Sequence, residues 1–122
     1  MLTFAYLLKI LKGILTLCGS TRFKKEYEQL NRELELNDWA VFTVASNYHK
    51  EKNSKLRKWI LKNKRRLDSL HLAKIDLSQA IVVIDVGGYT GSSTKSEITH
   101  AKQRNKPIYY WSDKSWKKLL DG

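Results

Sequence analysis

The sequence has one cysteine, one proline and only twelve acidic residues among its 122 positions. A single cysteine, Cys18, excludes an intramolecular disulfide, and no group of cysteines and histidines has the spacing of a zinc motif. No apolar run is long enough to span a bilayer. A chain of this length buries a sizeable core without such staples, so we expect one globular domain, with the cytoplasm as its default location.

Residues 1–12 are an apolar extension that we expect to lie outside the domain proper. The stretch is interrupted by Lys9 and lacks the charged start and the small-residue cleavage site of a signal peptide. We expect an amphipathic helix or an added strand that packs on the domain or on a second copy, in preference to membrane contact. The extension is assigned to residues 1–13 and the domain to residues 14–122.

Positive charge is abundant, with a formal net charge of +11. Much of it lies between residues 50 and 66, where Glu51 is the only acidic residue. The favoured interpretation is a solvated helix face, and the alternatives are nucleic-acid binding and attraction of an anionic small molecule to a nearby pocket. The cationic residues are Lys50, Lys52, Lys55, Arg57, Lys58, Lys62, Lys64, Arg65 and Arg66.

Short apolar runs alternate with amphipathic stretches along the chain. Strands are predicted at 14–18, 39–45, 81–86 and 107–111, and helices at 23–36, 54–78 with a break near 63–66, 94–104 and 112–120. This order predicts a single-domain, doubly wound α/β fold, Rossmann-like or flavodoxin-like, with a parallel sheet of four to five strands and helices on both faces. The inward-facing candidates are Leu56, Ile60, Leu67, Leu70 and Ile75 in the long helical stretch and Trp116, Leu119 and Leu120 in the last helix.

Parallel sheets of this kind bind ligands at the carboxyl ends of their strands. That edge is predicted to hold the turn 19–22, a polar loop at 46–53, Asp85 and the glycine-rich loop 87–93. The turn offers backbone N–H groups, two hydroxyls and an arginine at a helix N-terminus, which is chemistry for binding a phosphate or another small anion. Asp85 is a candidate contact to a ribose or a base.

Glu97 follows the glycine-rich loop, near the start of a predicted helix. A carboxylate there can attack the anomeric carbon of a sugar, or stabilise the positive charge that develops as a glycosidic bond breaks. The alternative is a capping box, in which Ser93 or Thr94 caps the helix and Glu97 returns a hydrogen bond. The pattern alone favours the cap.

The residues Cys-Gly-Ser-Thr-Arg at 18–22, with Ser-Thr-x-x-Glu at 93–97, resemble the nucleoside 2-deoxyribosyltransferase-like superfamily. The nearest branch in motif is that of the 2′-deoxynucleoside 5′-monophosphate N-hydrolases, and the similar strand–helix order covers residues 14 to about 112. The resemblance implies that Glu97 is the nucleophile. It also implies that Ser20 and Arg22, with a hydroxyl from Ser92 or Ser93, hold a 5′-phosphate. Members of the superfamily are commonly oligomeric, so a homo-oligomer is expected.

The chain departs from the family pattern in three places. Thr16 stands where the family usually carries an aromatic residue, and Tyr89 of the glycine-rich loop is the candidate to supply a phenol in its place. The family's second carboxylate has no obvious counterpart, because Asp76 would lie in the last turn of its helix, at the edge of the sheet away from the ligand. Asp68 and His71 lie nearer the ligand edge, and either could protonate the leaving base. The basic 50–66 segment is the third departure.

The sequence therefore predicts hydrolysis or deoxyribosyl transfer at the N-glycosidic bond of a nucleoside 5′-monophosphate or a related compound. Glu97, Asp68 and His71 are the candidate catalytic residues, and no metal or cofactor is expected. One alternative is a non-catalytic module that senses or sequesters a nucleotide, and a third is nucleic-acid binding through residues 50–66. The candidate ligand contacts are Gly19, Ser20, Thr21, Arg22, Asp85, Gly88, Ser92, Ser93 and Thr94.

Overall fold

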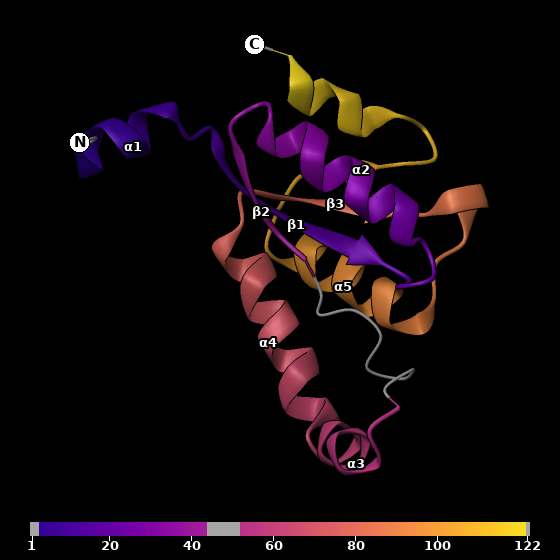
Figure 1. Ribbon diagram of the computed structural model, residues 1–122. Helices are drawn as coiled ribbons and strands as arrows, with labels where there is room; N and C mark the ends of the chain where they lie inside the picture. Colours follow the sequence, from indigo (N-terminus) through magenta and orange to yellow (C-terminus); the bar gives the residue numbers. More distant parts are fainter. Residues whose placement is uncertain (1–2, 44–51, 122) are drawn as a thin grey trace.

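A four-stranded, all-parallel sheet lies at the centre of the computed structural model, which describes residues 3–43 and 52–121 (Figure 1). The strands are β1 (Gly13–Gly19), β2 (Trp39–Phe42), β3 (Ala80–Ile84) and β4 (Ile108–Tyr110), in the order β2-β1-β3-β4. The helices are α1 (Phe4–Ile10), α2 (Lys24–Glu35), α3 (Ser54–Lys62), α4 (Lys64–Leu77) and α5 (Ser92–Gln103), with short 3-10 segments η2 (Val86–Gly88) and η3 (Ser115–Leu120). The predicted doubly wound α/β fold is confirmed.

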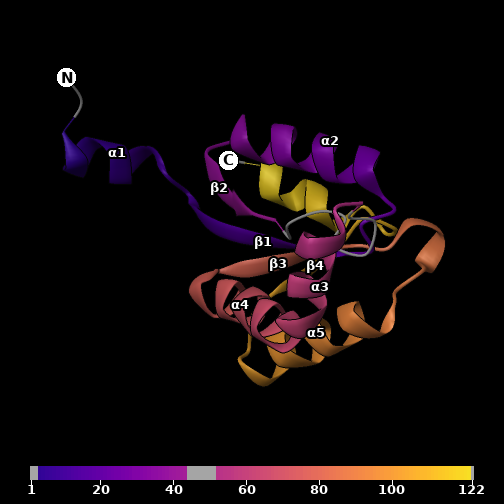
Figure 2. The same ribbon diagram turned by 60° about the horizontal axis from the view of Figure 1, so that its bottom comes forward.

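Helices cover both faces of the sheet. α2 and η3 lie on one face, and α4 and α5 lie on the other, as the two views agree (Figures 1 and 2). Successive side chains of a strand point to opposite faces. Leu15 and Leu17 of β1 therefore belong to the core under α2, whereas Cys18 belongs to the core under α4 and α5.

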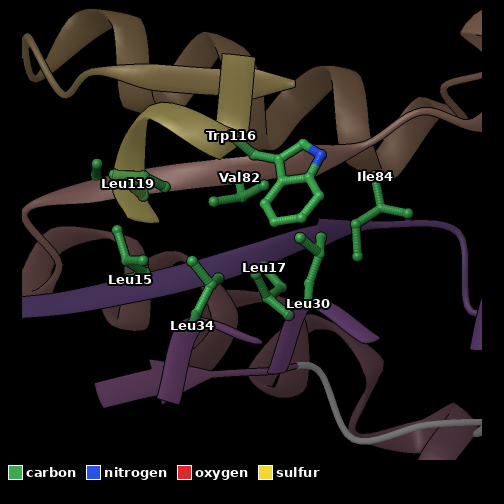
Figure 3. Packing of buried hydrophobic residues seen from close by; sticks show 9 residues of the cluster. Leu15, Leu17, Leu30, Leu34, Val82, Ile84, Trp116 and Leu119 are labelled. Carbon is green, nitrogen blue, oxygen red and sulfur yellow. The ribbon is translucent and has the colours of Figure 1, made fainter. Parts of the chain in front are cut away.

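The larger core lies between β1, β3, α2 and η3 (Figure 3). Leucines dominate it, and Trp116 of η3 closes its open side while its ring stacks on Trp111 with the centroids 5.7 Å apart. The labelled residues of Figure 3 are Leu15, Leu17, Leu30, Leu34, Val82, Ile84, Trp116 and Leu119. The inward positions predicted for the last helix are confirmed for Trp116 and Leu119, and Leu120 packs against the same core.

The predicted break in the long helical stretch is confirmed at Asn63, which ends α3 and precedes α4. The prediction that Leu56 and Leu70 face inward is wrong, because both side chains are exposed. The break stops one apolar stripe from continuing through both helices. α4 instead turns residues 67, 71 and 75 inward at spacings of four, and the middle one is a histidine.

α1 does not pack on the domain, so that part of the prediction for residues 1–12 is wrong. It is a helix without a single buried residue, and it extends away from the sheet (Figure 1). Packing on a second copy of the chain stays a prediction. Within residues 3–43 and 52–121, no helix is long and apolar enough to cross a membrane. The predicted loop at 46–53 falls largely on residues 44–51, which lie outside the described part of the chain.

The position at the end of β1, Gly19, has a backbone conformation and a close neighbour that favour glycine over any other residue. Its φ of +152° is a value that L side chains rarely adopt, and a Cβ there would lie 2.7 Å from the carbonyl oxygen of Ile84. We expect Gly19→Ala to lower the free energy of unfolding by about 1–3 kcal/mol in a urea titration. Gly91→Ala is the control, because φ at Gly91 is −78° and the nearest contact to an added Cβ is an ordinary 3.5 Å. Equal losses in both variants would contradict the argument.

Candidate functional site

A cavity of about 710 Å³ opens at the carboxyl ends of the strands, between the turn after β1, helix α4 and the start of α5. This is the edge where parallel α/β sheets bind ligands. The structure brings nine of the residues predicted from the sequence together around it. They are Gly19, Ser20, Thr21, Asp68, His71, Ser92, Ser93, Thr94 and Glu97.

Glu97 is a buried carboxylate in the wall of this cavity, with 8% of its surface exposed. The structure rules out the capping box, because α5 begins at Ser92 with Gly91 as its cap residue and has no acidic residue in its first turn. Glu97 therefore lies two residues deeper in its helix than the sequence predicted. Its Oε2 atom is 2.5 Å from Nε2 of His71, so the carboxylate contacts another side chain and not the helix terminus.

His71 comes from the inward stripe of α4 and is as buried as Glu97. Its Nε2 atom lies 2.5 Å from Glu97 and 3.8 Å from Sγ of Cys18. Its Nδ1 atom is buried and has no hydrogen-bond partner among the residues that the structure describes. A histidine this close to a carboxylate can pass a proton to it or take one from it, which is the arrangement that general acid–base chemistry needs.

Cys18 lies behind this pair, fully buried at the end of β1. Burial, and then the negative charge of Glu97, raise the pKa of its thiol well above the usual value. The thiol therefore stays protonated at neutral pH and is not a ready nucleophile.

On the other face of the sheet, Tyr27 donates a hydrogen bond of 2.8 Å from its hydroxyl to the carbonyl of Gly19. Burial, followed by the charges of Cys18 and Glu97, also raises the pKa of this phenol.

These two raised pKa values predict a loss of stability in alkali. The folded state keeps protons that the unfolded chain loses above its reference pKa values of 9.0 for Cys18 and 10.0 for Tyr27. Their contribution is complete below those values and falls as pH rises. Above pH 10 each group is expected to cost about 1.4 kcal/mol of unfolding free energy per pH unit. Urea titrations between pH 8 and 11 measure it. Tyr27→Phe should halve the slope that the two groups contribute above pH 10, and an unchanged slope would contradict the assignment.

The turn after β1 is closed by Arg22, which lies at the rim and does not line the cavity. The Arg22 guanidinium stacks over the ring of Tyr89 at 4.3 Å from the centroid, and its Nη2 donates to the Tyr89 hydroxyl at 3.3 Å. Its backbone N–H and its Nε both donate to the hydroxyl of Ser20. This contact joins the turn 19–22 to the loop 87–93, although the two are far apart in the sequence.

The structure leaves Asp85 and Gly88 out of the cavity. Both carboxylate oxygens of Asp85 accept hydrogen bonds from Ser112, one from its backbone N–H at 2.9 Å and one from its hydroxyl at 2.7 Å. Asp85 thus ties the end of β3 to the segment after β4. Gly88 has a positive φ of 82° and provides the turn that brings Tyr89 to the cavity.

The two candidate general acids occupy different environments. Asp68 lines the cavity, but its side chain is 59% exposed and pairs with Lys64 one turn earlier at 2.8 Å. His71 is buried and contacts Glu97 directly. Asp76 pairs with His100 and Arg104 outside the cavity, at the edge away from the ligand, as the direction of α4 predicted.

Thr16 does not replace the aromatic residue of the family pattern. Its hydroxyl lies 2.5 Å from that of Ser78 and donates to the carbonyl of Lys74 at 3.1 Å. Among the residues that the structure describes, Tyr89 is the aromatic one that lines the cavity. The sequence carried a signal for it only through the glycine-rich loop on which it stands.

Part of the basic segment lies beside the cavity. Lys64 of this segment lines it, and so do Ile60 and Leu61 of α3; Lys74, which also lines it, lies further along α4 and outside the segment. The remaining cationic side chains that the structure describes on α3 and early α4 are exposed. The structure thus places Lys64 of the basic segment at the cavity wall, where it pairs with Asp68.

Cys18, His71 and Glu97 form a cluster that the sequence analysis missed. Their ligand-type atoms lie within 4.8 Å of one another, although the residues are 53 and 26 positions apart. Only the inward stripe of α4, read with the strand register, could have placed His71 beside the end of β1.

Comparison of the chain with models of known families, with curated proteins and with solved structures finds no match.

Proposed function

We propose that this protein cleaves the N-glycosidic bond of a nucleoside 5′-monophosphate or a related compound, with Glu97 as the nucleophile. The observation that carries the proposal is a buried carboxylate in the wall of a cavity of about 710 Å³, paired at 2.5 Å with a histidine. The volume is typical of small-molecule sites. The resemblance in the turn 18–22 and in residues 93–97 supports the same assignment.

In the proposed reaction an oxygen of Glu97 forms a bond to C1′ as the bond from C1′ to the base nitrogen breaks. The electron pair of that bond goes to the base, and His71 supplies the proton that the base needs to leave, with Asp68 as the alternative donor. Water or a second base then attacks C1′, its proton passes to the His71 that gave one up in the first step, and the bond from C1′ to Glu97 breaks to free the carboxylate. The hydroxyls of Ser20 and Ser92, with Arg22 at the rim, would bind the phosphate.

A binding-only function is the second candidate, and a specific contact favours it. Glu97 is already hydrogen-bonded to His71, and Arg22 is already held by Tyr89. The contact between Glu97 and His71 must open before His71 can give its proton to a leaving base, and the contact between Arg22 and Tyr89 must open before that guanidinium can bind a phosphate. A module that senses or sequesters a nucleotide would need only the second of these changes.

The two candidates are separated by incubating the full-length protein with a panel of nucleoside and deoxynucleoside monophosphates and measuring free base by chromatography. Base release that disappears in a Glu97 variant supports the enzyme. Saturable nucleotide binding without release supports the binding module. Retardation of DNA with a steep salt dependence, without nucleotide binding, would replace both by nucleic-acid binding through the 50–66 segment.

A further inference from the structure

The cluster of Cys18, His71 and Glu97 combines three different metal-binding groups in one buried place. A thiol, an imidazole and a carboxylate converge from β1, α4 and α5, and their donor atoms lie within 4.8 Å of one another. Each of the three residues has at most 8% of its surface exposed. Sulfur and nitrogen donors favour zinc over magnesium or calcium, which prefer sites made of oxygen alone.

We propose that these three residues bind one zinc ion, with Sγ of Cys18, Nε2 of His71 and a carboxylate oxygen of Glu97 as ligands. The proposal goes beyond the glycosidase function and does not depend on it. The zinc-bound form would be inactive in that cleavage, because zinc would occupy the Glu97 carboxylate and Nε2 of His71, which the cleavage uses as nucleophile and proton donor. Three protein ligands with one position left for a water or a substrate atom is the pattern of accessible zinc sites. His71 and Glu97 line the cavity and Cys18 does not, so the sulfur binds from the sheet side and the fourth position faces the cavity.

The distances are close to those that zinc requires. Tetrahedral zinc with ordinary bond lengths places a sulfur and a nitrogen ligand about 3.6 Å apart, and a nitrogen and an oxygen ligand about 3.3 Å apart. The sulfur of Cys18 and Nε2 of His71 are already 3.8 Å apart. Nε2 of His71 and the Glu97 oxygen are 2.5 Å apart, so this pair must separate by less than an ångström.

The protons and charges of such a site balance. Zinc displaces the thiol proton of Cys18, which passes to solvent, and also the proton that lies between Nε2 of His71 and Glu97. That second proton moves to Nδ1, so that neutral His71 binds zinc through Nε2. The negative charge of Glu97 opposes a bare thiolate in this site. A dication between the two groups turns that repulsion into two attractions.

Titration calorimetry of the full-length, chelator-treated protein with zinc chloride tests the proposal. We expect one saturable site per chain. Cobalt(II) in the same site should give the intense thiolate-to-metal absorption that only sulfur ligation produces. Cys18→Ala should abolish that absorption and weaken zinc binding at least about tenfold. Even the loss of a residue that only hydrogen-bonds to a metal ligand weakens metal binding by that factor. His100→Gln is the matched control, because His100 also pairs with a carboxylate, Asp76, outside the cluster.

Thermal unfolding followed by circular dichroism shows whether Cys18→Ala folds. If it does not, Glu97→Gln, which keeps the side-chain volume, must weaken zinc binding by a similar factor. The absence of a saturable site, a cobalt spectrum without the sulfur band, or equal zinc affinity in Cys18→Ala or Glu97→Gln would overturn the proposal. Nucleotide cleavage is assayed separately in the presence of a chelator, so its failure and the failure of zinc binding are distinguishable.

Discussion

Glu97→Gln is expected to lower the rate of base release from the best nucleotide of the panel at least about a thousandfold, a loss of roughly 4 kcal/mol of transition-state stabilisation. The amide is close in size to the carboxylate but cannot attack C1′. It can still form a hydrogen bond with His71, so the fold and the cavity should persist. Nucleotide affinity, measured by calorimetry, should stay within a few-fold of the original value.

The matched control is Glu28→Gln, which makes the same change at an exposed position of α2 where the side chain pairs only loosely with Lys24, at 3.9 Å. It should leave the rate unchanged. His71→Gln should lower the rate by about 10²–10⁴-fold, the usual range for a proton donor. Asp68→Asn should then have little effect. Full activity of Glu97→Gln would remove the carboxylate from the mechanism.

Leu17→Ala is expected to lower the free energy of unfolding by about 2–5 kcal/mol, a large share of the total for a domain of this size. Leu17 is fully buried in a central strand and packs between α2 and η3 (Figure 3). Its loss leaves a cavity that close-packed neighbours on two sides cannot fill by small shifts. Urea titration at neutral pH measures the change.

Leu36→Ala is the control for this prediction, because it removes the same atoms from a side chain that is 76% exposed. It should change the free energy of unfolding by about 0.5 kcal/mol or less. Comparable losses at positions 17 and 36 would mean that the core shown in Figure 3 does not dominate the stability.

The order of the elements and the place of the cavity could be predicted from the sequence because both depend on local patterns. Continuous apolar runs identified β1 and β3, and the direction of parallel strands places the turn at 19–22 and the start of α5 at one edge. The same argument predicted that Asp76 lies outside the site. In the structure Asp76 pairs with His100 and Arg104, away from the cavity.

The predictions that were wrong concern how one helix or strand packs against another. α5 begins at Ser92, two residues before the predicted start, and this moves Glu97 from a capping position to a contact with another helix. Leu56 and Leu70 are exposed, because the inward faces of α3 and α4 are set by how each helix packs on its neighbours. Asp85 is turned toward Ser112, because the segment after β4 passes the end of β3. Local periodicity carries no signal for any of these outcomes.

The larger hydrophobic core and the candidate site lie on opposite faces of the sheet. The leucine-rich core with Trp116 lies under α2 and η3, whereas Glu97, His71 and Cys18 lie under the other face. Directed evolution can exploit that division. Stabilising substitutions confined to α2 and η3 raise thermal tolerance, and the margin they create absorbs the cost of reshaping the cavity wall on α4 and α5 for new ligands.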